Sequence, residues 1–238
     1  MNSLSEHSPG LWTQNLPALR KLSDYKLIAF DMDSTLINIE CIDEMAAVVG
    51  RQQEVSAITE AAMRGEIADY KDSLRKRVAL LQGAPAGVMQ QVFEQKLQLN
   101  PGVKQLMAAC QQAGLYTLIV SGGFDYFTDR LQTLLGIDDT RSNKLEIIDG
   151  VLTGRLLDQE WGDICDGEEK KRMVQATSAK RGITASQCIA VGDGSNDLPM
   201  MGWCGLSVAY QAKPKVRQQA QIAIDSGGLD RMLEIIRP

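Results

Sequence analysis

The sequence contains a single histidine, His7, which lies in a polar stretch near the N-terminus. A Ser-His-Asp triad, a Cys-His pair, a phosphohistidine mechanism and most zinc hydrolases each need a histidine in the site. The scarcity of histidine, and the place of His7 outside any candidate site motif, therefore argue against all of these classes. A general acid or base in this protein has to be a carboxylate, a lysine, a tyrosine or a cysteine.

Cysteine is also sparse, with five scattered residues and no CxxC pair. A zinc knuckle and a redox-active pair are therefore excluded. No cysteine is followed by arginine six positions later, so a cysteine-based phosphate loop is absent as well. We expect the five residues to be buried free thiols in a reducing compartment.

Long apolar runs and basic blocks are both missing. The longest apolar runs hold about five residues, whereas about 20 are needed to span a bilayer, and the N-terminal residues lack the apolar core of a secretory signal. We therefore expect a cytoplasmic protein without a membrane partner. The net charge is −5, which argues against a nucleic-acid partner but permits a small anionic substrate bound by a local cluster of cations.

Short apolar runs alternate with helical patterns, as in a parallel sheet covered by helices. The expected strands are residues 27–30, 116–120, 188–191 and 205–209. Between 145 and 156, Asp149-Gly150 separates two β-like runs and predicts a hairpin. We expect an α/β fold with a doubly wound, Rossmann-like parallel sheet.

Residues 42–100 have a different pattern, with about four short helices and no clear strand. Leu74, Val78 and Leu81 follow the i, i+4, i+7 spacing of one apolar helix face. We therefore expect a small helical insert after the first strand. The expected division is a lead-in tail over 1–22, a core over 23–38 and 101–238, and the insert over 39–100.

Polar clusters follow three of the expected strands: DMDST at 31–35, SGG at 121–123 and GDGSND at 192–197. Sites in open α/β sheets form outside the carboxyl ends of the strands, so these clusters should share one rim. Asp31 and Asp33 point to one face if the chain is still extended there. A carboxylate-rich site without histidine suits Mg²⁺.

A phosphate group would find partners on the same rim. The glycines after Ser121 allow backbone amides to approach closely, and the serine hydroxyl can donate a hydrogen bond. Lys170 or Lys171, at the start of an expected helix, could supply the cation. Two other motifs fail: the segment after Asp193 lacks the glycine and glutamate of a calcium loop, and no GxxxxGK[ST] nucleotide loop occurs.

In this order, DMDST, SGG, a lysine and GDGSND resemble the four motifs of the haloacid dehalogenase-like phosphohydrolases. With ECIDE at 40–44 and SLRKR at 73–77, the match is closest to the phosphoserine phosphatase branch of that family. The resemblance runs from about Lys26 to the C-terminus. The helical insert falls where that family carries its cap domain.

The resemblance implies a role for each motif. Asp31 would attack phosphorus and form an aspartyl-phosphate, while Asp33 would protonate the leaving oxygen and then activate water. Mg²⁺ would be held by Asp31, the backbone carbonyl of Asp33 and Asp193, with Asp197 close by. The phosphoryl group would be bound by Ser121, Gly122, Lys170 and Asn196. From the cap, Glu40 would meet the substrate ammonium and Arg77 its carboxylate, with Met63 and Tyr70 as candidate pocket walls.

The implied function is Mg²⁺-dependent hydrolysis of L-phosphoserine, the last step of serine biosynthesis. An alternative is a phosphatase or phosphotransferase of the same family that acts on another small phosphomonoester, such as phosphohomoserine or phosphothreonine. A signalling receiver domain shares the acidic rim, but it is about half this length and lacks a helical insert. An inactive binding protein is disfavoured because every motif position holds a competent residue.

Overall fold

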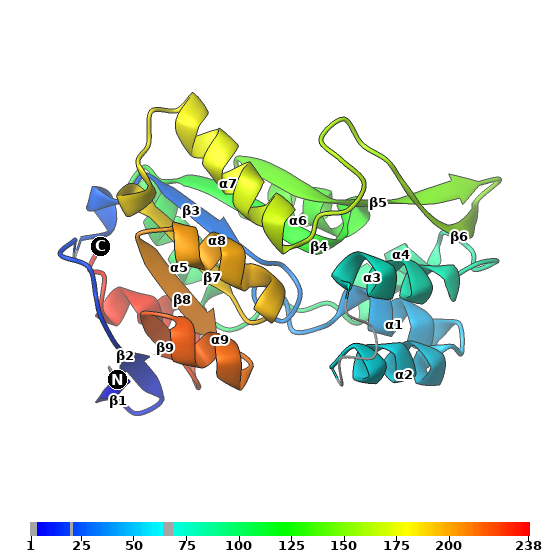
Figure 1. The fold of residues 1–238 in the computed structure, drawn as a ribbon, viewed down its shortest axis with the longest axis horizontal. Helices are drawn as coiled ribbons and strands as arrows, with labels where there is room; N and C mark the ends of the chain where they lie inside the picture. Colours follow the sequence, from blue (N-terminus) through cyan, green and yellow to red (C-terminus); the bar gives the residue numbers. More distant parts are fainter. Residues whose placement is uncertain (1–3, 20, 64–68) are drawn as a thin grey trace.

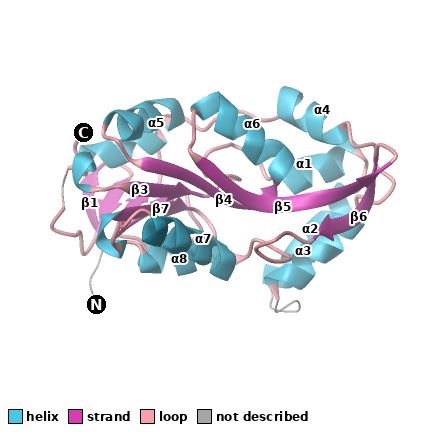
Figure 2. Cartoon of the chain, turned by 90° about the horizontal axis from the view of Figure 1, so that it is seen from above, coloured by secondary structure: helices cyan, strands magenta, loops and turns pink. Residues whose placement is uncertain are grey.

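The computed structural model describes residues 4–19, 21–63 and 69–238, apart from the side chains at 62 and 63. Within these residues the strands form one sheet in the order β1-β2-β9-β8-β7-β3-β4-β5-β6 (Figure 1). Helices cover both faces of this sheet (Figure 2). The expected α/β class and doubly wound sheet are confirmed.

Six neighbouring strands run parallel. They are β9 (Ile222–Ile224), β8 (Leu206–Tyr210), β7 (Cys188–Gly192), β3 (Leu27–Phe30), β4 (Tyr116–Phe124) and β5 (Asp139–Ile148). All residues of β3 are buried, because helices cover the sheet on both sides, and this explains its continuous apolar run. The four expected strands are all present. Strand β9 was missed because it is only three residues long, and most of β5 was missed because it begins with polar residues.

Alternate side chains of β3 enter two separate hydrophobic cores. Ile28 and Phe30 belong to the core on one face, whereas Leu27 and Ala29 belong to the core on the other. The first face is covered by α5 (Val103–Gln112) and α6 (Asp125–Leu135). The second is covered by α7 (Gly167–Lys180), α8 (Leu198–Trp203) and α9 (Pro214–Gln219).

The chain leaves β3 at the switch point of the sheet. Strand β3 pairs with β4 on one side, where Phe30 lies opposite Ile119, and with β7 on the other, where Phe30 lies opposite Val191. The carboxyl ends of these three strands therefore meet, and they leave a crevice of the kind in which α/β proteins bind ligands.

The helical insert lies between β3 and β4, beside this crevice (Figure 1). It consists of α1 (Cys41–Val48), α2 (Gln52–Met63), α3 (Tyr70–Ala79) and α4 (Val88–Gln95). The expected apolar face is buried, with Leu74, Val78 and Leu81 at most 2% exposed.

The predicted hairpin is present and joins the insert to the sheet. Asp149 and Gly150 both have positive φ, as a tight two-residue turn requires, and they connect β5 to the antiparallel β6 (Val151–Leu157). The amide of Gly83 donates to the carbonyl of Leu152 at 2.9 Å, and the amide of Leu152 donates to the carbonyl of Ala84 at 2.8 Å. The insert is therefore held by the hairpin as well as by its own two connections.

The N-terminal residues differ from the tail that we expected. Strands β1 (Ser5–Ser8) and β2 (Leu11–Thr13) form a hairpin, and β2 pairs antiparallel with β9 at the sheet edge. Strands of three or four residues carry too little periodicity to be recognised, and β1 is mostly exposed and polar.

The cysteines are all buried and free of disulfides, as expected. Among the described residues, no helix is both long and apolar enough to cross a bilayer.

Candidate active site

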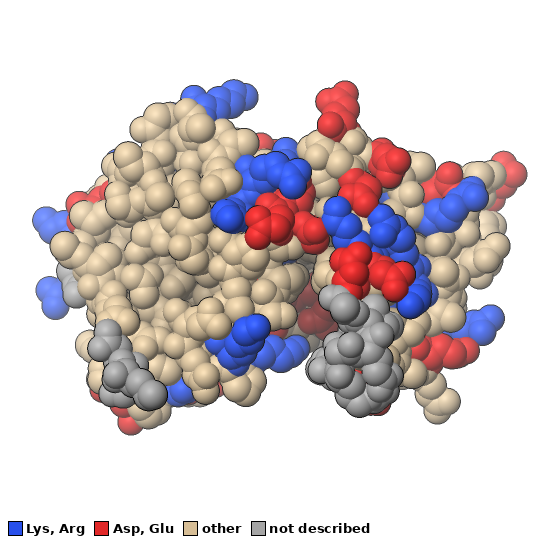
Figure 3. Space-filling model, viewed as in Figure 1, with Lys and Arg blue, Asp and Glu red and all other residues tan. Residues whose placement is uncertain are grey.

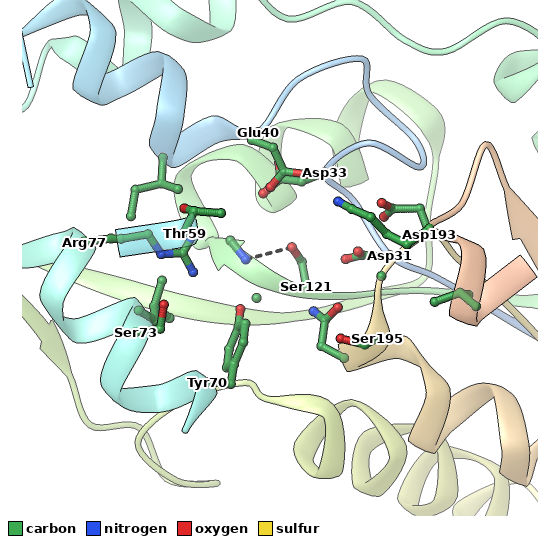
Figure 4. Close-up of a pocket in the computed structure, with 18 of the residues that line it drawn as sticks. Asp31, Asp33, Glu40, Thr59, Tyr70, Ser73, Arg77, Ser121, Asp193 and Ser195 are labelled. Atoms are coloured by element: carbon green, nitrogen blue, oxygen red, sulfur yellow. Dashed lines mark hydrogen bonds between the residues drawn. The ribbon is translucent and has the colours of Figure 1, made fainter. Parts of the chain in front are cut away.

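A cavity of about 650 Å³ lies between the insert and the carboxyl ends of β3, β4 and β7. It opens as a hollow in the molecular surface, with acidic side chains deep inside and basic side chains on one rim (Figure 3). Lys213 and Lys215, at the start of α9, line it from the sheet side. Tyr70, Ser73 and Arg77 line it from α3 (Figure 4).

A buried ion-pair network lies at and beneath the floor of the cavity, which it reaches through Asp31. The Nζ of Lys170 lies 2.7 Å from Oδ1 of Asp31 and 2.7 Å from Oδ1 of Asp197. Burial alone would lower the pKa of Lys170, but the charges and hydrogen bonds of both carboxylates outweigh it, so this pKa lies well above its ordinary value. The lysine therefore stays charged. Lys171 instead lies 3.6 Å from Glu168 and away from this network, which favours Lys170 of the two candidates.

Three buried carboxylates in this floor could hold a metal ion. Asp31, Asp193 and Asp197 each offer an oxygen within 4.8 Å of the others. Both oxygens of Asp197 are already bound, Oδ1 to Lys170 and Oδ2 to the amides of Asp193 and Gly194. Asp31 and Asp193 are therefore the better direct ligands, and three carboxylates against one lysine leave a negative charge that suits a divalent cation.

The pKa shifts show how poorly the protein alone neutralises this cluster. Burial, followed by the charge of Asp197, raises the pKa of Asp31 well above its ordinary value despite Lys170. The same two causes raise the pKa of Asp193 to about 7. A divalent cation bound between these carboxylates would reverse both shifts, because it favours their charged forms.

Asp33 stands apart from the three clustered carboxylates. Its Oδ1 accepts a hydrogen bond from the amide of Cys41 at 3.4 Å. Burial and then the charge of Glu40 raise the pKa of Asp33 to about 8. At neutral pH this carboxyl group carries a proton, which is the form that a general acid needs.

The phosphate-loop candidate is an irregularity at the end of β4. The register between β4 and β5 shifts between Val120 and Phe124. The amide of Gly123 donates to the Oγ of Ser121 at 2.9 Å (Figure 4). The oxygen of Ser121 is thus used as an acceptor, which leaves its hydroxyl proton free to donate to a ligand.

A fully buried side-chain amide, which no local sequence pattern indicates, supports this loop. Asn143 donates from Nδ2 to the carbonyl of Gly122 at 2.7 Å and accepts from the amide of Cys165 at 2.8 Å. Gly122 leaves room for the cap, since a Cβ there would clash with the hydroxyl oxygen of Tyr70 unless the tyrosine or the loop shifted.

The remaining predicted residues line the cavity wall. Glu40 precedes α1, and its Oε1 accepts a hydrogen bond from Ser34 at 2.7 Å. Arg77 reaches the cavity from α3, and its Nε is buried without a hydrogen-bond partner among the described residues. Asn196 lies on the opposite wall. Tyr70 is a wall residue as expected, whereas the side chain of Met63 lies outside the described residues.

The sequence reasoning missed several polar wall residues. They are Thr59, Ser73, Ser195, Lys213 and Lys215. Single polar residues on helix faces or at loop ends carry no signal that separates a cavity wall from a solvated surface.

Comparisons with known proteins agree with this geometry. The haloacid dehalogenase-like hydrolase family matches residues 28–202. A phosphoserine phosphatase of Polaromonas sp. is 62% identical over 98% of this chain and 99% of its own length. A solved phospho-aspartyl intermediate analogue of phosphoserine phosphatase superposes with a TM-score of 0.82 at 35% identity, covering 90% of this chain and 99% of that one. A substrate-bound phosphoserine phosphatase gives the same TM-score of 0.82 at 34% identity, with the same coverage of both chains.

The fold, the acidic rim and these matches define a haloacid dehalogenase-like hydrolase. Within this class, the chain belongs to the phosphoserine phosphatase family.

Proposed function

We propose that this chain hydrolyses L-phosphoserine to serine and phosphate through an aspartyl-phosphate on Asp31. The observation that carries the proposal is the pairing of a lysine-held carboxylate, Asp31, with a second carboxyl group, Asp33, beside the same cavity, where burial raises the pKa of Asp33. The names of the similar proteins, including the phospho-aspartyl analogue and the substrate complex, support the same substrate and intermediate.

The first step transfers the phosphoryl group to Asp31. Its Oδ1 already accepts hydrogen bonds from Lys170 and from the amide of Met32 at 2.8 Å, so Oδ2 is the oxygen that attacks phosphorus. The phosphorus–Oδ2 bond forms as the bond from phosphorus to the serine oxygen breaks. The proton of Asp33 moves to that serine oxygen, so that serine leaves as a neutral alcohol.

The second step releases phosphate. Asp33, now a carboxylate, takes a proton from a water molecule as the water oxygen attacks phosphorus. The phosphorus–Oδ2 bond breaks, which restores the Asp31 carboxylate and the protonated Asp33. Splitting the displacement into two steps is the general advantage of covalent catalysis.

Asp31, Asp193 and the backbone carbonyl of Asp33 would hold Mg²⁺, with Asp197 beside them. When bound, the ion would neutralise charge on the phosphoryl oxygens. Lys170, Ser121, the amide of Gly122 and Asn196 bind and orient those oxygens.

The amino-acid end of the substrate meets the cap. Arg77 binds the substrate carboxylate, because its buried guanidinium Nε has no hydrogen-bond partner within the described part of the chain and calls for an acceptor. Glu40, whose carboxylate accepts a hydrogen bond from the hydroxyl of Ser34, binds the ammonium group. Residues 39–100 thus serve as a cap over a core formed by 23–38 and 101–238.

We also place the reaction in the cytoplasm as part of serine biosynthesis, in keeping with five free thiols.

Phosphate release tests this function. L-Phosphoserine, phosphothreonine and phosphohomoserine are compared at equal concentration, with Mg²⁺ and with EDTA, using the wild type and Asp31→Asn. We expect strong preference for L-phosphoserine and loss of activity with EDTA or Asp31→Asn. Equal activity on all three substrates would contradict the cap assignments, and activity that survives Asp31→Asn would contradict the nucleophile.

A further inference from the structure

Helix α3 of the cap has two functional faces. Tyr70, Ser73 and Arg77 line the cavity. Lys71 and Arg75 lie on a different side of the helix, because at 3.6 residues per turn each is rotated by about 100° to 160° from the cavity-lining residues. Both of these basic residues bind a segment of the core that is far away in sequence.

That segment is the loop between β6 and α7. The Nζ of Lys71 lies 2.7 Å from Oδ1 of Asp163, and Nη2 of Arg75 lies 2.6 Å from Oδ2 of the same carboxylate. Lys71 also lies 3.7 Å from Oδ2 of Asp166. One carboxylate is thus shared by two cations of the cap, and one of those cations reaches a second carboxylate.

The same loop fixes the catalytic lysine. Asp166 caps the N-terminus of α7 by accepting the amide of Glu169 at 2.9 Å. Its carbonyl accepts the amide of Lys170 at 2.9 Å. The residue before it, Cys165, is held by its amide hydrogen bond to the buried Asn143. The loop is therefore anchored rigidly to the phosphate end of the site.

We propose that Asp163 and Asp166 are positioning residues that clamp the outer face of α3 and so set the spacing between Arg77 and Lys170. The phosphate end of a substrate is bound near Lys170 and its carboxylate end near Arg77. The clamp fixes the distance between these two binding groups and therefore selects substrates by length. It favours phosphoserine over phosphohomoserine, which is one methylene longer. This inference rests on the proposed function only in naming the substrate.

Partly exposed ion pairs are individually weak, and the side chains of Lys71 and Asp163 are 30% and 38% exposed. A shared carboxylate in a network contributes more than an isolated pair. The expected effect of breaking it is therefore modest and falls on substrate binding. Asp163→Asn should raise KM for L-phosphoserine about three- to tenfold and change kcat less, with reduced preference over phosphohomoserine.

Lys71→Met and Lys76→Met form a matched pair of variants. Both lysines lie on α3 and both form an ion pair, but Lys76 binds Asp72 of the same helix at 2.8 Å, whereas Lys71 bridges to the core. We expect Lys71→Met to behave as Asp163→Asn does and Lys76→Met to behave as the wild type. The double variant Lys71→Met/Asp163→Asn should lose less than the sum of the two single losses, since both single variants remove the Lys71–Asp163 contact. Asp163→Glu should restore part of the affinity.

Hydrogen exchange tests the clamp independently of activity. The amides of α3 should exchange faster in Lys71→Met and Asp163→Asn than in Lys76→Met, because the helix has lost its attachment to the loop. The clamp is overturned if all three variants exchange alike, or if Asp163→Asn lowers kcat equally for every phosphomonoester without changing KM. A wild type that shows no preference for L-phosphoserine would instead contradict the proposed function, and the exchange result would still decide whether the clamp exists.

Discussion

Lys170 binds the carboxylate of Asp31 at 2.7 Å with both side chains buried. The lysine is completely enclosed and also binds Asp197, so a single cation pairs with two carboxylates at once. Under the proposed mechanism its role is structural as well as catalytic: it holds the proposed nucleophile and at the same time stabilises the buried carboxylates in the folded state.

Lys170→Met is predicted to damage both activity and stability. Loss of the cation should lower kcat by about 10²- to 10³-fold. In EDTA it should also lower the free energy of unfolding by about 3 kcal/mol, because buried carboxylates are left unpaired. Urea unfolding with EDTA and with Mg²⁺ measures this loss of unfolding free energy. The loss should be smaller with Mg²⁺, because a cation bound to the unpaired carboxylates stabilises the folded state. Lys171→Met is the control, and a larger effect there would refute the choice of lysine.

The raised pKa of Asp33 predicts a pH dependence for formation of the aspartyl-phosphate. The acid form of this group exists below its pKa of about 8, so the first step should slow as the pH rises through that value. Single-turnover measurement of serine release at increasing pH tests this prediction. A rate that stays constant to pH values well above the pKa would show that the leaving oxygen is protonated by another group.

The same pKa predicts an effect on stability, with a defined sign. The folded pKa of Asp33 lies above the ordinary value of 3.8, so the folded state binds the proton more tightly than the unfolded state does. The stability that this tighter proton binding adds to the folded state is fully present below the ordinary pKa value and is lost as the pH rises through about 8. Asp33→Asn, which cannot ionise, should therefore gain stability relative to the wild type as the pH rises across this window. Denaturant titrations in EDTA at pH values on both sides of it measure the difference.

A residue larger than glycine at position 122 is predicted to clash with Tyr70. A Cβ on Gly122 would clash with the hydroxyl oxygen of Tyr70, so Gly122→Ala must shift the tyrosine side chain, the phosphate loop or the cap. We expect kcat/KM to fall by about 10- to 100-fold, because small displacements of a positioned group are costly. Tyr70→Phe removes the clashing oxygen, and the double variant should recover part of the loss. If it recovers none, the damage lies in the loop itself rather than in its contact with the cap.

Much of the fold and of the acidic rim could be predicted from local patterns. The run at Leu27–Phe30 is buried from both faces, so its composition alone indicates a central strand, and the clusters that follow such strands must meet at one edge. Asp149-Gly150 likewise carries its turn geometry in its own residue types.

Other features depend on contacts between distant segments and leave no local pattern. Asn143 supports the loop at Gly122 from the neighbouring strand, and Asp163 binds α3 across 88 positions of sequence. Each is a single polar residue in an unremarkable segment, so nothing in the surrounding residues separates it from a solvated side chain. The choice of Glu40 and Arg77 as substrate ligands came only from resemblance, and their places on the cavity wall are consistent with it.

Arg77 offers a test in which its replacement by methionine should impair substrate binding while the stability of the fold is largely kept. If it binds the substrate carboxylate, Arg77→Met should raise KM for L-phosphoserine by about 10- to 100-fold, as for loss of a charged hydrogen bond. Phosphoethanolamine, which has the phosphate and ammonium groups but no carboxylate, should be hydrolysed equally by the wild type and the variant. Because Nε of Arg77 has no hydrogen-bond partner among the described residues, its removal breaks no hydrogen bond at that atom and should change the thermal midpoint much less than it changes KM. Equal losses for both substrates, or a marked loss of stability, would show instead that Arg77 holds the cap together and that the carboxylate is bound elsewhere.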